Sequence, residues 1–360
     1  MYKIYYGCDI TGIDITDKFK ELFIKSDKIL IPKGTTFNKI FGDPCPTIVK
    51  NISVNSNNRC IKSINEKETI NDIIFDLTNM IHIYIYCNRN TYHYFNDYIT
   101  TINKIIKATI IYDIDEDIMN KNNIIIFMQT IPLTVSNKSN INNNLFVLNT
   151  EQLSNNSHLN NIKRISNNLN IIDYSRENID IMNKNNIKNT IYFPYIYNKT
   201  EIYDFAKTED ICGIGILNTD KRKLLYNSLL ENNKITNISG WEKQRDIILF
   251  KHKILLNISA FDHYNIFETI RCNRCLFNKM IIISDEKYNT DLIDYSHHIL
   301  FTKLEDMSEL ITKVISNYDY YYKKLDLDNI NYELNNDLIN PQILINYHKP
   351  PVTPPGSLPV

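Results

Sequence analysis

The chain has 360 residues, of which 43% are hydrophobic and 22% are charged, and its formal net charge is −1. A chain of this length is expected to form at least two compact domains, and its hydrophobic content excludes a disordered protein. The near-zero charge argues against an overall field that would draw the protein to nucleic acid or to an anionic membrane surface.

Cysteine usage and hydropathy indicate where the protein works. Seven cysteines are scattered over the chain, and an odd number without regular spacing is typical of reduced thiols rather than of a disulfide framework. The longest apolar runs have the length of a strand, and the first residues, MYKIYYGCDITG, lack the pattern of a signal peptide. We therefore expect a cytoplasmic protein with no integral membrane segment.

Residues 1–79 predict a small β-rich module, because short strand-like segments such as KIYYG and KILIPKG are divided by glycines and by the segment GDPCP. From residue 80 onwards, apolar strands alternate mostly with helix-length stretches. These strands are MIHIYIYCN, ATIIYDI, NIIIFMQTIP, NNLFVLNTEQ, LNIIDYS and NTIYFPY. Such alternation predicts a parallel sheet covered on both faces, and we assign residues 80–205 to a first Rossmann-like domain.

Residues 206–330 repeat this pattern and predict a second Rossmann-like domain. The segments DICGIGIL, KITNISG and KILLNISAF have the character of strands, and DKRKLLYNSLLEN and WEKQRDIILFKH have that of helices. Two doubly wound domains in succession imply a cleft between them, with residues 199–210 as the connector. Residues 331–360 form a tail, either native or added, whose proline-rich end cannot join the interior of a sheet.

Two glycines near the end of the first strand of the second domain predict a phosphate site. Gly213 and Gly215 precede a helix that carries Lys221, Arg222 and Lys223. Backbone N–H groups at a helix N-terminus, together with the helix dipole, favour an anion. The alternative is that both glycines only permit close packing of strand and helix. The spacing matches neither the dinucleotide-binding nor the P-loop fingerprint.

The segment YNIFETIRCNRCLFNKM predicts a helix after the strand KILLNIS. Glu268 lies in its first turn, at the carboxyl end of the strand, where open α/β sheets bind ligands. A carboxylate there can accept two hydrogen bonds from the vicinal diol of a ribose. The alternative is that Glu268 only complements the helix dipole or pairs with Arg271 or Arg274.

The other face of this helix and the loop before it raise two further questions. Cys272 and Cys275 are predicted to point away from the sheet, as a C-x2-C pair with no second pair of ligands nearby. We therefore expect half-buried thiols and no metal site. His263, in the loop, is either a contact to a ligand phosphate or an ordinary surface residue.

The first domain offers a candidate base. Glu151 follows the strand NNLFVLN, and Asp173 and Asn178 lie at the end of the next strand. Both places face the predicted cleft if the strands are parallel. Glu151 could activate an acceptor hydroxyl as a general base, or it could be an N-cap or capping-box residue of the following helix.

Several of these segments resemble GT-B glycosyltransferases, in particular those encoded by large DNA viruses. DICGIGILNTDKR, ISGWEKQRD and KILLNISAFDHYNIFETIRCNRCLFNKMIIISD resemble their carboxy-terminal half, and LNTEQLS, NIIDYSREN and IYFPYIYN their amino-terminal half. The resemblance covers roughly residues 80–325. It implies an α/β fold with two Rossmann-like doubly wound domains (GT-B) after the β-rich module, and host cytoplasm as the location.

The resemblance also implies a donor site in the second domain. Glu268 matches the second glutamate of an E-x7-E motif, which binds the donor ribose, whereas Ala260 replaces the first glutamate, so retention and inversion both stay open. Arg222 matches the basic residue after the glycine loop, and Arg245 is a second candidate for stabilising the departing diphosphate. The expected donor-binding residues are Gly213, Gly215, Arg222, Arg245, His263, Tyr264, Asn265, Ile266 and Glu268.

We therefore expect a metal-independent glycosyltransferase that moves a sugar from a UDP- or GDP-linked donor to a hydroxyl of a glycan or glycoprotein acceptor, with no cofactor and no nucleic-acid partner. Glu151 is the expected base if the reaction inverts. Two alternatives remain: a nucleotide-sugar epimerase, or a catalytically degenerate protein that binds glycans or has a structural role in a virion.

Overall fold

The computed structural model describes residues 2–8, 12–25, 28–46, 48–56, 59–65, 72–76, 82–114, 118–119, 123–129, 131, 145–167, 169–195, 201–215, 219–230, 235–240 and 242–330. The predicted tail, 331–360, lies outside them, as do residues 199–200 of the predicted connector. The chain forms two compact units, one of Met1–Cys87 with Ile106–Ile126 and one of Asn88–Ile105 with Phe127–Val360. The boundaries expected after residues 79, 205 and 330 stay predictions.

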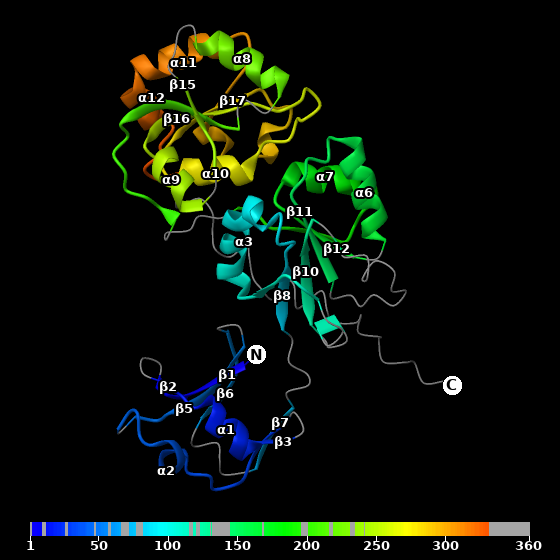
Figure 1. Ribbon diagram of the computed structural model, residues 1–360, viewed down its shortest axis with the longest axis vertical. Helices are drawn as coiled ribbons and strands as arrows, with labels where there is room; N and C mark the ends of the chain where they lie inside the picture. The colour runs from blue at the N-terminus through cyan, green and yellow to red at the C-terminus, as the bar shows by residue number, and fades with distance from the viewer. Residues whose placement is uncertain are drawn as a thin grey trace, which may run out of the picture. The chain divides into compact units, whose positions relative to one another are not determined.

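The amino-terminal part of the first unit consists of two small antiparallel sheets, in the orders β2-β1-β5-β6 and β3-β4-β7 (Figure 1). Their strands are β1 (Tyr2–Gly7), β2 (Gly12–Asp14), β3 (Ile24–Lys25), β4 (Lys28–Ile31), β5 (Asn51–Ser56), β6 (Arg59–Asn65) and β7 (Ile73–Asp76). Ile4 and Tyr6 of β1 are buried, on either side of the half-buried Tyr5, and pack against aromatic residues of α1 (Thr16–Phe23) and α2 (Phe37–Phe41). The predicted β-rich module is confirmed.

A six-stranded sheet has the order β13-β12-β11-β10-β8-β9, and its β8/β9, β11/β12 and β12/β13 pairs are parallel. Its strands are β8 (Ile83–Tyr86), β9 (Thr109–Ile111), β10 (Ile124–Met128), β11 (Leu145–Asn149), β12 (Asn170–Asp173) and β13 (Thr190–Tyr192). The helices along this stretch include α3 (Tyr92–Ile106), α6 (Asn156–Ser166) and α7 (Arg176–Lys184). Every residue of β10 and β11 is buried, which explains why their sequences are continuously apolar.

A second parallel sheet has the order β15-β14-β16-β17-β18. Its strands are β14 (Glu209–Ile214), β15 (Ile235–Ile238), β16 (His252–Asn257), β17 (Ile281–Asp285) and β18 (Ile299–Thr302), and its helices are α8 (Asp220–Leu230), α9 (Glu242–Leu249), α10 (Thr269–Phe277), α11 (Met307–Ser316) and α12 (Tyr318–Lys324). In Figure 1, α8, α11 and α12 cover one face of this sheet, and α9 and α10 cover the other. The chain leaves β14 towards β15 and returns to β16 on the other side, so the carboxyl ends of β14 and β16 flank the crevice that such sheets use for ligands.

The prediction for α10 was wrong on one point. Cys272 and Cys275 are 0% and 1% exposed, not half-buried. The cause is packing on a second side of the helix, because Arg274 of α10 forms ion pairs with Asp246 of α9 and Asp97 of α3. A helix held between a sheet and two other helices has little surface left for solvent.

The predicted fold class, two Rossmann-like sheets with helices and a small β-rich module before them, is confirmed by the strand orders and the parallel pairing. In the described part of the chain, no helix combines the length and the apolar character needed to cross a membrane.

Candidate functional site

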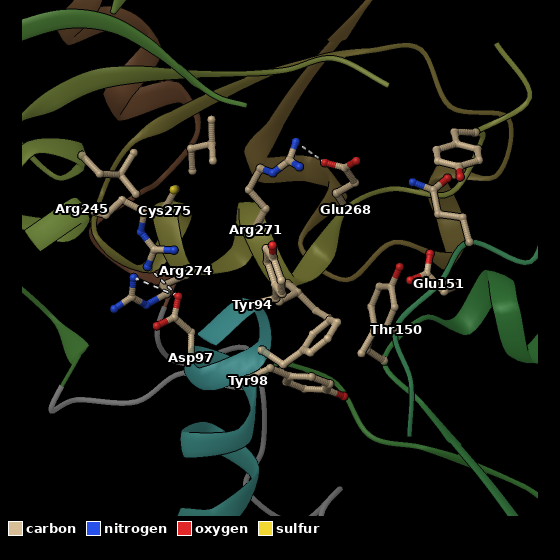
Figure 2. A pocket seen from close by; sticks show the side chains of 17 residues that line it. Tyr94, Asp97, Tyr98, Thr150, Glu151, Arg245, Glu268, Arg271, Arg274 and Cys275 are labelled. Carbon is tan, nitrogen blue, oxygen red and sulfur yellow. Dashed lines mark hydrogen bonds and ion pairs between the residues drawn. The ribbon is translucent and has the colours of Figure 1, made fainter. Parts of the chain in front are cut away.

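A cavity of about 310 Å³, here called the central pocket, is lined by residues of the second unit alone. Helix α3 contributes Tyr94 and Tyr98, the segment after β11 contributes Glu151, and the N-terminal part of α10 contributes Glu268 and Arg271. Figure 2 shows these side chains around the cavity, with carboxylates from both Rossmann-like halves. The pocket therefore combines aromatic rings, acids and cations.

Glu268 is the N-cap residue of α10, and its side chain is held by two arginines. Arg222 Nη2 lies 3.4 Å from Glu268 Oε1, and Arg271 Nη1 pairs with Oε2. Arg222 also donates from Nε to Ile258 O (2.8 Å) and from Nη1 to Gly215 O (3.3 Å). The glycine loop, Arg222 and Glu268 thus converge at one place, and the expected pairing of Glu268 with Arg271 also exists.

The charges around Glu268 influence one another. The pKa of Arg222 is lowered, first by burial and then by the neighbouring charge of Arg271, while Glu268 opposes the shift. One carboxylate therefore holds two guanidinium groups, and the three groups together carry one positive charge. Such a group favours an added anion over an added cation.

The two glycines have different roles. Gly213 lies inside β14, in register with Asn237 of β15 and Leu256 of β16, so it belongs to the sheet and not to the loop. Gly215 follows the strand with a φ of 60°, a left-handed conformation that favours glycine. Helix α8 begins only at Asp220. The glycine loop predicted from both residues is therefore carried by Gly215.

Arg245 was expected to face a diphosphate, but it belongs to a buried cluster of charges. This arginine cluster consists of Arg245, Arg274, Asp97, Asp246 and Glu201, whose Oε2 lies 3.5 Å from Arg274 Nε. Arg245 Nη2 contacts Asp97 Oδ2 (2.6 Å) and Asp246 Oδ1 (2.7 Å), and Arg274 binds both oxygens of Asp246 at 2.6 Å. In Figure 2 the arginine cluster lies apart from Glu151.

The pKa values within the arginine cluster keep it charged. Burial alone would lower the pKa of Arg274, but the hydrogen bonds to Asp246 and the charge of Asp97 outweigh burial and raise it. Burial alone would raise the pKa of Asp246, but its bonds to Arg274 and the charge of Arg245 lower it. Three carboxylates thus surround two arginines, so the arginine cluster carries a formal net charge of −1.

The loop before α10 contacts the first Rossmann-like half through consecutive amides. Asn265 N donates to Ser154 Oγ (3.4 Å), and Ile266 N donates to Gln152 Oε1 (3.2 Å). Phe267 N donates to Glu177 Oε2 (3.2 Å). The backbone that the resemblance brings to a diphosphate is therefore already hydrogen-bonded.

The remaining residues of this loop divide between pocket and surface. Tyr264 lines the central pocket. His263 is exposed, and its ring stacks on Phe261 at a centroid distance of 5.5 Å. Glu177 lies outside the lining of the central pocket and holds this loop through Phe267 N, a role that the sequence did not reveal. Its burial raises its pKa to about 7, against the bond from Phe267 N and the charge of Lys287.

Glu151 lines the central pocket and is partly exposed. Gln129 Nε2 donates to its Oε1 at 2.6 Å, and His158 Nε2 lies 3.6 Å from Oε2. The N-cap of α6 is Asn155, whose side chain accepts from Ser157 N. The capping alternative for Glu151 was therefore wrong.

A buried polar network holds the segment that carries Glu151. Asn149 Nδ2 donates to Glu151 O (2.9 Å) and Asp173 Oδ2 (2.7 Å). Asn178 Nδ2 donates to the same carbonyl and to Asp173 Oδ1, both at 3.0 Å. Burial raises the pKa of Asp173 to about 7, although these hydrogen bonds lower it. The strand-end residues noted in the sequence thus position Glu151.

Among the described residues, no three His, Cys, Asp or Glu side chains lie close enough together to hold a metal ion. Cys272 and Cys275 are free thiols inside α10, and burial raises the pKa of both, that of Cys275 to about 12. Buried thiols of this kind are poor metal ligands because the thiolate is the binding form.

No protein-family model matches the chain. Its relatives include three uncharacterized proteins of Acanthamoeba polyphaga mimivirus. Protein L140 is 28% identical over 245 residues, 64% of this chain and 78% of that protein, and R358 is 27% identical over 239 residues, 62% and 82% respectively. Protein L138 is 30% identical over 263 residues, 65% of this chain but 29% of its own length. The expected relationship to proteins of a large DNA virus is confirmed.

Solved structures with a similar fold include TarM, with a TM-score of 0.47 and 13% identity over 64% of this chain and 55% of that chain. Sucrose-phosphate synthase of Thermosynechococcus elongatus has a TM-score of 0.42 and 10% identity, over 61% of this chain and 70% of that chain. An α1,3-fucosyltransferase with GDP has a TM-score of 0.44 and 11% identity, over 74% of this chain and 88% of that chain. These are GT-B glycosyltransferases, the class that the sequence resembles. Because every score is below 0.5, the fold class rests on the strand orders above.

Proposed function

We propose that this protein is a metal-independent glycosyltransferase that moves a sugar from a nucleotide-sugar donor to an acceptor hydroxyl in the cytoplasm. The observation that carries the proposal is the composition of the central pocket. Glu151 enters it from one Rossmann-like half, and Glu268 and Arg271 enter it from the other. A transferase needs such a convergence of acid, base and cation, because it must hold two substrates and a leaving group together.

The donor belongs to the side of Glu268. Its carboxylate can accept hydrogen bonds from the two ribose hydroxyl groups, and the guanidinium groups beside it complement a diphosphate. Both substituents occur in a UDP- or GDP-linked sugar. The diphosphate gains charge as it leaves, so fixed cations at this place lower the barrier more than they tighten binding of the intact donor.

The acceptor belongs to the side of Glu151 and of the Tyr94 ring of α3. Tyr94 is 52% exposed, and a ring of this kind offers an apolar face and a polar tip to a glycan. In an inverting reaction Glu151 takes the proton of the acceptor hydroxyl. The hydroxyl oxygen then bonds to the anomeric carbon, while the bond from that carbon to the diphosphate breaks and the diphosphate keeps the electron pair.

The test is turnover of a panel of UDP- and GDP-sugars, followed as release of nucleoside diphosphate, with and without an added glycan acceptor. We expect Glu268→Ala to abolish transfer and donor hydrolysis without unfolding the protein. The matched control Glu309→Ala changes an exposed glutamate of α11 outside the central pocket and should leave turnover intact. Unchanged turnover in Glu268→Ala would contradict the proposal, and an isomerised sugar still linked to nucleotide would identify an epimerase instead.

A further inference from the structure

Three arginines line the central pocket, and they differ in how much of each remains accessible. The side chains of Arg245 and Arg274 are each 8% exposed and are bound within the arginine cluster. The side chain of Arg271 is 24% exposed. Of these three cations, Arg271 is the one that an anion entering the pocket can reach.

Arg271 and Arg222 hold Glu268 from opposite oxygens, but only one of them can readily move. The side chain of Arg222 is 5% exposed, and its three guanidinium nitrogens contact Ile258 O, Gly215 O and Glu268. Besides Glu268, Arg271 has one long polar contact among the described residues, from Nη1 to Asn257 Oδ1 at 3.5 Å. Arg222 is therefore a fixed support of the glycine loop and Glu268, whereas Arg271 can exchange its partner at low cost.

We propose that the Glu268–Arg271 ion pair opens when the donor binds, so that Arg271 binds the diphosphate and Glu268 Oε2 is released to accept from the ribose. This proposal rests on the proposed function, and it assigns the diphosphate to Arg271, where the sequence had assigned it to Arg222 and Arg245. The exchange is favourable because Arg271 gains a doubly charged partner with matching fork geometry. It also relieves the repulsion between the two arginines that share one carboxylate.

The probe is inorganic pyrophosphate, titrated calorimetrically into the full chain in a magnesium-free buffer. We expect Arg271→Gln to weaken binding by about 10- to 100-fold, the range for one hydrogen bond to a charged group. Arg271→Lys keeps the positive charge but loses the fork geometry, so its affinity should fall between those of the unmodified protein and Arg271→Gln. The matched control Arg164→Gln removes an exposed arginine of α6, whose Nη2 donates to Asn161 Oδ1 at 3.1 Å, and should bind as the unmodified protein does.

The variant Glu268→Gln distinguishes an exchange of ion-pair partners by Arg271 from a purely structural role of Arg271. If Glu268 competes with the anion for Arg271, removing its charge should tighten pyrophosphate binding by about 3- to 10-fold, because a competing charge at a partly exposed site is worth about one pKa unit or less. If Arg271 only supports Glu268, the variant should weaken binding or leave it unchanged. The two substitutions are therefore expected to act in opposite directions.

Several results would overturn the proposal: no pyrophosphate binding by the unmodified protein, equal binding by Arg271→Gln, or weaker binding by Glu268→Gln. Circular dichroism of each variant shows whether it is folded, and Arg271→Ala replaces Arg271→Gln as the test if the latter is not. Absent sugar transfer together with the expected pyrophosphate pattern would refute the glycosyltransferase and leave the anion site at Arg271 standing.

Discussion

Replacing Asp246 by asparagine should destabilise the second unit more than any exposed charge change can. Asp246 is 1% exposed, and its two oxygens accept from Arg274 at 2.6 Å each and from Arg245 at 2.7 and 3.0 Å. Asparagine keeps the shape but loses the negative charge between two buried cations. Removing one partner from a buried ion pair costs about 3 to 5 kcal/mol.

The assay is urea unfolding followed by circular dichroism, in which a loss of this size lowers the midpoint by about 1 to 2 M. The matched control is Asp328→Asn, whose carboxylate is 64% exposed and pairs with Lys279 at 2.8 Å, and which should cost less than about 1 kcal/mol. Because the pKa of Asp246 is lowered, its contribution is present above its unfolded value near 3.8 and is lost as pH falls through its folded pKa. Equal midpoints for Asp246→Asn and the control at pH 7 would refute this account of the arginine cluster.

Two further predictions concern single residues of the site. Glu177 has its pKa raised from 4.5 to about 7, so its stabilising effect is complete below pH 4.5 and is lost as pH rises through 7. Between pH 4.5 and 7, the unfolding free energy of Glu177→Gln should therefore rise by up to about 3 kcal/mol relative to that of the unmodified protein. The measurement is unfolding free energy against pH, and parallel curves for the two proteins would contradict the prediction. Gly215→Ala should lower the unfolding free energy by about 1 to 2 kcal/mol because φ is 60° there. Gly12→Ala should lower it less, because an added Cβ there meets its nearest atom at an ordinary 3.6 Å. Equal denaturation midpoints for the two variants would show that the conformation at residue 215 does not require glycine.

The architecture could be predicted because it depends on local patterns. Runs such as IIIFM and LFVLN are buried throughout their length, and their alternation with helices implies parallel strands before any contact is known. The position of Glu268 could be predicted in the same way, since a helix start after a strand places its first residues at the carboxyl edge of the sheet. The burial of Cys272 and Cys275 could not, because it depends on what packs on the far side of α10.

The sequence by itself determined the two Rossmann-like sheets, the β-rich module and the acidic residues at the strand ends, because hydrophobic period and turn residues act over a few positions. The tertiary structure alone decided which charges meet. Arg245 finds Asp97 148 positions away, and Phe267 N finds Glu177 90 positions away. These partners determine that Arg245 is neutralised and Arg271 is accessible, and such pairings follow from how whole elements pack, which no local pattern encodes.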